Sequence, residues 1–215
     1  MTNHIYAKYY PDNIDNIYVH QNTDEKTIAL TFDDGPHPTK TDAILAVLKK
    51  YGVKATFFVI GENAQQCPDV LQRIYEQGHE IGNHTYDHKS IYKIKNDTLL
   101  CSVKKCEQII YQITGKKTVF FRPPEGYLND FIAESMFRAG YDVILWRVDT
   151  YDWKGRSAND IYNTVLNTVK CGDIILMHDY ISRVSYTPEA LDKIIPALIY
   201  KGYKFVTVSE LIDNP

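Results

Sequence analysis

Residues 26–52 read KTIALTFDDGPHPTKTDAILAVLKKYG and predict one strand followed by one helix. The run from Thr27 to Phe32 is apolar and rich in residues that favour strands, as expected of a buried strand. Gly35-Pro36 provides a break after it. The next residues repeat apolar side chains with helical spacing, and Gly52 lies just past the end of that pattern. The stretch therefore predicts one unit of a parallel α/β sheet.

The same alternation of strand and helix patterns continues to the end of the chain. Further strands are predicted at Ala55–Ile60, Val119–Phe121, Val143–Val148, Ile174–Met177 and Phe205–Val208, with a weaker one at His79–Gly82. Helices are predicted to start near Pro68, Asp97, Asn129, Ser157 and Thr187, with Pro196 expected to kink or split the last one. Seven strand–helix units predict parallel strands with right-handed crossovers, and at this length a closed or nearly closed barrel.

Composition bounds the size and the partners of the protein. The chain has 215 residues, of which 44% are hydrophobic, which is enough for one well-buried domain. The first 25 residues, rich in Tyr, Asn and Asp, are expected to be an extension packed outside the core, followed by one domain over residues 26–215. A net charge of −3 and a pI near 6.2 argue against binding to nucleic acid or an anionic membrane.

The sequence contains no apolar stretch near the roughly 20 residues that a membrane span needs. The residues after Met1 also lack the basic start and apolar segment of a secretion signal. Two compartments stay open: the cell envelope or the exterior if a signal has been removed, and the cytoplasm if Met1 is the native start.

The four cysteines show no CxxC pair and no regular spacing. Cys101 and Cys106 point about 140° apart on the predicted helix. We expect unpaired and mostly buried thiols. A disulfide that involves Cys67 or Cys171 stays open.

Polar residues of catalytic type recur where the predicted strands end. They are Asp33, Asp34, His84, Arg122, Asp149, Asp152 and His178. In a β/α barrel, the loops at that end assemble the active site. His84 and His88 are four residues apart, so we expect them on one side of a helical turn, close enough to share a cation. With a carboxylate from another segment they would form an open two-His, one-carboxylate metal site, which is typical of catalysis.

Five segments then point to a family. They read Thr31-Phe32-Asp33-Asp34-Gly35-Pro36, His84-Thr85-Tyr86-Asp87-His88, Arg122-Pro123-Pro124, Asp149-Thr150-Tyr151-Asp152-Trp153 and Leu176-Met177-His178-Asp179. In this order they resemble the motifs of the polysaccharide deacetylases, the NodB-like enzymes of the fourth carbohydrate-esterase family, over residues 26–211. The resemblance implies a distorted (β/α) barrel with about seven strands and a catalytic domain over residues 26–215.

The resemblance also implies the roles of the catalytic residues. It assigns the metal ligands as Asp34, His84 and His88, which would bind Zn²⁺, with Co²⁺ or another divalent transition metal as the alternative. Asp33 would be the general base and His178 the general acid that protonates the departing amine. Arg122 is expected to keep Asp33 ionised and oriented, and Asp152 to raise the pKa of His178.

The substrate contacts follow from the same resemblance. Pro124 is expected to contact the substrate, and the backbone N–H of Glu125 to stabilise the oxyanion. Trp153 and Leu176 resemble the walls of an acetyl pocket, with ordinary core packing as the alternative. The family often has an aromatic residue where this chain has Glu125. An acid there could favour a cationic or partly deacetylated glycan, or disfavour acidic peptidoglycan stems. Tyr127 and Tyr151 are candidates for stacking on a sugar in place of that aromatic residue.

The predicted reaction is hydrolysis of the N-acetyl amide on a glycan that contains N-acetylglucosamine, such as peptidoglycan or a chitin-type oligomer. An O-acetyl esterase acting on xylan is the alternative within the family, and an inactive glycan-binding relative is another. An Fe(II) oxygenase also uses two histidines and a carboxylate, but it would have no use for the Arg122 and Asp152 pairs. A glycosidase is disfavoured because adjacent Asp33 and Asp34 are poorly placed to flank a glycosidic bond. The sequence specifies no oligomeric state.

Overall fold

One parallel sheet forms the centre of the molecule. The computed structural model describes residues 16–92 and 95–213. Its strands are β1 (Ile17–Tyr18), β2 (Thr27–Asp33), β3 (Thr56–Val59), β4 (Glu80–Asn83), β5 (Phe120–Phe121), β6 (Asp142–Ile144), β7 (Val148–Asp149), β8 (Ile174–His178) and β9 (Lys204–Val206). They follow the order β1-β6-β5-β4-β3-β2-β8-β7, and β9 pairs with β2. Among the described residues no ladder joins β1 to β7, so the barrel is incomplete. The predicted α/β fold with a distorted barrel is confirmed.

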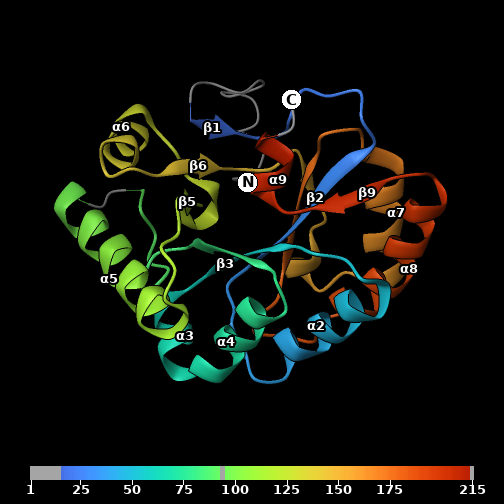
Figure 1. The fold of residues 1–215 in the computed structure, drawn as a ribbon, viewed down its shortest axis with the longest axis horizontal. Helices are drawn as coiled ribbons and strands as arrows, with labels where there is room; N and C mark the ends of the chain where they lie inside the picture. Colours follow the sequence, from blue (N-terminus) through green and yellow to red (C-terminus); the bar gives the residue numbers. More distant parts are fainter. Residues whose placement is uncertain (1–15, 93–94, 214–215) are drawn as a thin grey trace.

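Helices surround the sheet, as Figure 1 shows for α2 to α5, α7 and α8. They are α2 (Lys40–Tyr51), α3 (Gly61–Gln66), α4 (Pro68–Glu76), α5 (Asn96–Thr114), α6 (Asp130–Arg138), α7 (Ala158–Thr168), α8 (Thr187–Tyr200) and α9 (Val208–Asp213). The predicted caps are present where the chain enters α6 and α7: Asn129 accepts a hydrogen bond from the N–H of Ile132, and Ser157 from that of Asp160. None of the described helices has the length and apolar character to cross a bilayer.

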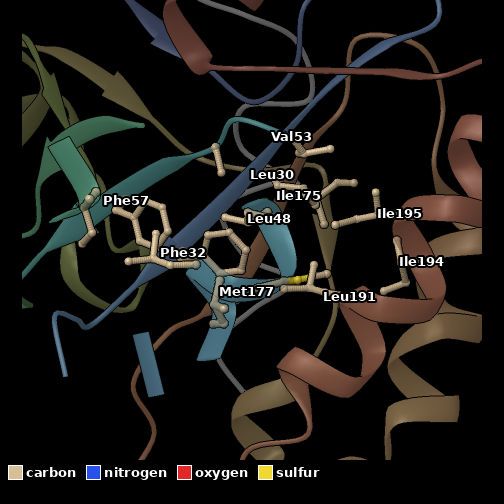
Figure 2. Close-up of a cluster of buried hydrophobic side chains, with 14 of the residues drawn as sticks. Leu30, Phe32, Leu48, Val53, Phe57, Ile175, Met177, Leu191, Ile194 and Ile195 are labelled. Carbon is tan, nitrogen blue, oxygen red and sulfur yellow. The ribbon is translucent and has the colours of Figure 1, made fainter. Parts of the chain in front are cut away.

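The largest hydrophobic cluster lies between the sheet and the helices α2 and α8. Figure 2 shows Leu30 and Phe32 of β2 beside Leu48 of α2 and Leu191 of α8. The rings of Phe32 and Phe57 stack with centroids 5.0 Å apart. Burial of these side chains against the helices holds β2 and β8 at the centre of the sheet. The carboxyl ends of the central strands are therefore rigidly placed.

Several predicted elements differ from the structure. The strand predicted at Val143–Val148 is two short strands, β6 and β7. At the end of β6 and directly after it, the carbonyls of Ile144 and Leu145 accept hydrogen bonds from the Arg122 guanidinium, both at 3.0 Å, so a side chain satisfies these oxygens where the strand breaks. Pro196 does not split α8, which runs unbroken through it. The short helices α3 and α9 were not predicted.

The predicted N-terminal extension is only partly described. Residues 1–15 lie outside the described part of the chain. Ile17 and Val19 are buried in a hydrophobic cluster, and β1 pairs with β6. The expectation that the first 25 residues pack outside the core is therefore wrong for this strand. A domain boundary at residue 25 stays a prediction.

All four cysteines are free thiols, as expected. Cys106 is buried and Cys67 and Cys171 are half-buried. Cys101 is exposed on α5, so the expectation of mostly buried thiols is wrong for that residue.

Candidate active site

The end of β2 presents two adjacent carboxylates. Asp33 is the last residue of the strand and is buried. Adjacent side chains on a regular strand point to opposite faces. Asp34 avoids this with a φ of 77°, which ends the extended conformation. Both carboxylates can therefore line the same pocket.

A residue to which the sequence assigned no role fastens this turn. The Asp179 carboxylate accepts hydrogen bonds from the N–H of Gly35 at 2.8 Å and from the hydroxyl of Thr41 at 2.6 Å. A side chain at position 35 would collide with it, because a Cβ there would lie 1.9 Å from Asp179 Oδ2. In the sequence, only the position of Asp179 directly after His178 indicated that it could belong to the site.

His84 and His88 approach each other in a loop and not on a helical turn, so that prediction is wrong. β4 ends at Asn83, and both Thr85 and His88 have positive φ, at 66° and 47°. The Asn83 side chain accepts from the N–H of Thr85, and the Thr85 hydroxyl accepts from the N–H of His88. These two local bonds fold the loop so that the imidazole centroids lie 4.8 Å apart.

The two histidines meet Asp34 at one point. The possible ligand atoms of Asp34, His84 and His88 all lie within 4.8 Å of one another. His84 Nδ1 lies 2.7 Å from the carbonyl of Arg122, which orients the ring and leaves Nε2 toward Asp34. Burial lowers the pKa of His84 to about 4, so its imidazole is neutral at physiological pH.

This set of donors fits a divalent transition metal. Asp34 Oδ1 is buried without a hydrogen-bond partner. His84 Nε2 lies 3.6 Å from it and His88 Nε2 lies 3.4 Å from it. Two imidazoles and one carboxylate are ligands that zinc and cobalt accept. A shared cation would satisfy the orphaned oxygen, which is otherwise costly to bury.

Asp33 is held by a buried arginine. Arg122 is fully buried, and its Nη1 donates to Asp33 Oδ1 at 2.8 Å and to the Thr31 hydroxyl at 2.8 Å. The guanidinium carbon lies 4.0 Å from the centre of the Phe58 ring. Its other donors reach the carbonyls of Ile144 and Leu145 at the end of β6, so Arg122 links Asp33 to that strand. Thr31 was not predicted as part of this network.

His178 is held by a buried carboxylate. The Nδ1 atom of the His178 ring lies 2.8 Å from Asp152 Oδ1, and the backbone N–H of His178 donates to Asp152 Oδ2 at 2.8 Å. Thr187, which was not predicted here, donates its hydroxyl to the same Oδ2 at 2.8 Å. Burial alone lowers the pKa of His178, but the charge and hydrogen bond of Asp152, with smaller effects of Asp34 and Asp33, raise it to about 10. The imidazole is therefore cationic at neutral pH.

These groups surround one pocket of about 400 Å³. Its lining residues are Asp33, Asp34, His84, His88, Glu125, Gly126, Trp146, Trp153, Leu176 and His178. Three of the predicted substrate contacts, Glu125, Trp153 and Leu176, are among them. Two are not: Pro124 is buried beside the pocket, and Tyr127 packs edge-on against Tyr92.

Trp146 lines the pocket and was not predicted. It packs against Gly126, where a Cβ would approach its ring to 2.6 Å. It lies between β6 and β7, in the segment predicted as one continuous strand. The break in that strand decides which way the ring points, so the sequence carried no usable signal for its role. Asp149, one of the polar residues that the sequence places at strand ends, accepts a hydrogen bond from the N–H of Tyr151.

Comparison with known proteins gives consistent matches. Residues 20–144 match the family described as polysaccharide deacetylase. The chain is 43% identical over 195 residues to a peptidoglycan-N-acetylglucosamine deacetylase of Bacillus cereus, covering 87% of this chain and 89% of that protein.

Two solved structures extend the comparison. The crystal structure of the Bc1960 peptidoglycan N-acetylglucosamine deacetylase superposes with a TM-score of 0.89 at 38% identity, covering 93% of this chain and 94% of that one. A family 4 acetyl xylan esterase from Clostridium thermocellum, in complex with a cobalt ion, gives a TM-score of 0.80 at 36% identity, covering 86% and 89%. With the fold, the five motifs and these matches in agreement, the chain belongs to the polysaccharide deacetylase family.

Proposed function

We propose that the protein is a metal-dependent hydrolase that removes N-acetyl groups from a glycan containing N-acetylglucosamine, with peptidoglycan as the first candidate. One observation carries the proposal. The cluster of Asp34, His84 and His88 shares its pocket with a buried base–arginine pair and a buried acid–carboxylate pair. This combination suits hydrolysis of an amide, which needs an activated water and a proton for the leaving amine.

Asp34, His84 and His88 would hold the metal ion. Zn²⁺ is the first candidate, and Co²⁺ is the alternative. A divalent ion bound there supplies Lewis-acid chemistry, since it acidifies water and polarises a carbonyl. The chain's own residues perform the remaining tasks.

Asp33 accepts the proton of the attacking water. Its carboxylate lies beside the proposed metal ligands, with Asp33 Oδ2 3.7 Å from His84 Nε2. The other oxygen, Oδ1, is held by Arg122, so the free oxygen faces the pocket in a fixed direction. The backbone N–H of Glu125 is the proposed donor to the developing oxyanion.

His178 donates a proton to the departing amine. An amide nitrogen is a poor leaving group unless it is protonated, so a cationic imidazole at this position lowers the barrier. The Asp152 carboxylate keeps the ring cationic and holds Nδ1, so that Nε2 is the atom available to the substrate. Trp153 and Leu176 are the proposed walls of the acetyl pocket.

A second candidate is an O-acetyl esterase, because the chain also resembles a family 4 acetyl xylan esterase. An alkoxide leaves more easily than an amine, so an esterase depends less on His178. The presence of the complete Asp34–His84–His88 cluster and both supporting pairs disfavours an inactive glycan-binding relative. Action on peptidoglycan would agree with a location at the cell envelope.

The test strips the protein of metal, restores zinc, and measures acetate released from a short N-acetylglucosamine oligomer, from peptidoglycan and from acetylated xylan. We expect release from the first two that depends on zinc. Release from xylan alone would replace the proposal with the esterase. No release from any of them, with zinc bound, would overturn it in favour of a binding protein.

A further inference from the structure

Four cations gather at one side of the proposed active site. Lys154 and Arg156 follow β7, Arg183 follows β8, and Lys40 begins α2. Lys154, Arg156 and Arg183 are exposed, and Lys40 is partly exposed. The whole protein has a net charge of −3, so this cluster of four cations differs in sign from the protein as a whole.

Contacts join these cations into one surface beside Trp153. The Lys154 Nζ lies 4.8 Å from the centre of the Trp153 ring and 4.5 Å from that of Tyr151. The guanidinium carbon of Arg156 lies 5.3 Å from the centre of the same Tyr151 ring. Gly155, between the two, comes close to Arg183: a Cβ there would lie 3.3 Å from Arg183 Cδ. Since Trp153 lines the pocket, the surface begins at the pocket wall.

The fourth cation ties the loop after β8 to α2. Lys40 Nζ donates hydrogen bonds to the carbonyls of Ile181 and Arg183, the second at 3.1 Å. This contact fixes the backbone that carries the Arg183 side chain. We refer to Lys40, Lys154, Arg156 and Arg183 as the basic rim.

None of these four forms an ion pair with a carboxylate in residues 16–92 and 95–213. Other exposed cations of the protein do: Lys50 pairs with Asp192, Arg138 with Glu134, and Lys193 with Glu189. Arg156 Nη1 donates to the Thr164 hydroxyl at 3.0 Å, and Lys40 uses two of its donors on backbone carbonyls. Lys154 and the remaining guanidinium donors of Arg156 and Arg183 are the ones that the rim offers to a ligand.

The pocket also has a carboxylate on the loop after β5, outside the proposed metal cluster. Its lining includes no lysine or arginine, and Glu125, on the loop after β5, adds a third carboxylate to Asp33 and Asp34. A substrate with negative charge on one side would therefore be attracted by the basic rim and repelled near Glu125. The two charges together select one orientation of the glycan.

We propose that the basic rim binds carboxylates carried by the sugar next to the one that is deacetylated, so the preferred substrate is an anionic, muramoyl-containing glycan. This inference rests on the proposed function and narrows its substrate class. The shared chemistry is a carboxylate beside an N-acetylated sugar, and it has two sources in peptidoglycan: the lactyl group of muramic acid and the stem peptide. Arginine and lysine with free donors bind such groups by charge-assisted hydrogen bonds.

The test compares zinc-loaded wild-type protein with the double variant Arg156→Gln/Arg183→Gln. The control is Lys116→Gln/Lys117→Gln, which removes two exposed cations just before β5, at the opposite end of the strands from the pocket. The substrates are a neutral N-acetylglucosamine oligomer, a muramoyl glycan without stems, and the same glycan with stems. The readouts are kcat/KM for acetate release and the affinity measured by calorimetry, both at low and high salt.

We expect the ratio of kcat/KM for the anionic over the neutral substrate to fall about fivefold in the rim variant at low salt and to stay unchanged in the control. High salt should lower the wild-type ratio toward that of the variant, because exposed charges are screened. A fall already present without stems assigns the lactyl group, and a fall only with stems assigns the peptide. An equal ratio in wild type and rim variant, with acetate released, overturns the inference and leaves the function standing. If no substrate releases acetate, the function fails and the calorimetric affinities decide the inference: equal wild-type affinity for neutral and anionic glycans overturns it.

Discussion

Asp33 and Asp34 show how two identical neighbouring residues take on different chemistry. The carboxylate of Asp33 is held by Arg122, whereas Asp34 Oδ1 has no hydrogen-bond partner and faces two imidazoles. The difference comes from the turn at Asp34, whose φ of 77° separates the two side chains into different surroundings. Roles at this scale are set by neighbours and not by residue type.

The division of roles predicts the effect of Asp33→Asn. The amide keeps the shape of the side chain and can still accept from Arg122, but it cannot take a proton. We expect the protein to retain its metal while kcat/KM falls by about 10²- to 10⁴-fold. Metal content and acetate release check this, and loss of metal would refute the assignment. His88→Ala is the contrasting variant, since it should lower metal occupancy.

The Asp152–His178 pair predicts a shift of the pH profile. His178 is the proton donor only while it is protonated, so activity is present below its pKa and is lost as the pH rises through it. Burial lowers that pKa, but Asp152 raises it to about 10, and a bound cation would offset part of the smaller effects of Asp34 and Asp33. We expect an alkaline limb near or below pH 10 in the wild type and a limb at clearly lower pH in Asp152→Asn. Profiles of kcat/KM against pH that coincide for the two proteins would contradict the assignment.

At the scale of elements, loops and not regular segments place the chemistry. The strands supply rigid ends, and the positive φ angles at Asp34, Thr85, His88, Glu125 and Tyr151 turn the chain immediately beyond them. Such conformations cost a non-glycine residue free energy, so they persist only where surrounding contacts hold them. Asn83, Thr85 and Asp179 provide such contacts.

Two glycines with similar backbone angles allow a matched test of a connection in the sheet. Gly172 precedes β8 with a φ of 76°, and a Cβ there would lie 1.8 Å from the carbonyl oxygen of Gln21. Gly115 ends α5 with a φ of 71°, and a Cβ there would meet nothing within 4 Å. Gly115→Ala should therefore lower the free energy of unfolding by about 1–2 kcal/mol, the cost of the left-handed conformation alone.

Gly172→Ala should cost clearly more, about 3 kcal/mol or greater, since the segment at Gln21 must also move away from the start of β8. Urea unfolding of both variants measures the difference. Equal losses would show that the N-terminal segment yields freely and is not fixed against β8.

At the scale of the whole molecule, β1 covers one edge of an incomplete barrel. Ile17 is buried against β6, and its register partner is Val143. We expect Ile17→Ala to lower the free energy of unfolding by about 2–5 kcal/mol, as for other buried large-to-small changes. Ile199→Ala, at an exposed position on α8, is the control and should change it by only about 0.5 kcal/mol. Similar losses for the two variants in urea unfolding would mean that the segment around Ile17 contributes nothing to the core.

Much of this protein follows from its sequence alone. Alternating apolar runs and capped helices determine a parallel α/β sheet, because local propensity and hydrophobic burial favour the same elements at Thr27–Asp33 or Lys40–Tyr51. The candidate site residues Asp33, Asp34, His84, Arg122, Asp152 and His178 were also named from the sequence, since parallel strands bring their carboxyl ends to one edge.

Tertiary structure decided the rest, for a physical reason. The strand predicted at Val143–Val148 breaks after Ile144, where the carbonyl of Ile144 accepts a hydrogen bond from Arg122, 22 residues away in the chain. That break sets the position of Trp146 in the pocket. The turn after Asp34 depends on a hydrogen bond from Gly35 to Asp179, which lies far away in the chain. The loop of His84 and His88 depends on the positive φ angles of Thr85 and His88. The basic rim exists only where the loops after β7 and β8 meet α2. Local sequence determines which elements form, but contacts between segments far apart in the chain determine which side chains share a site.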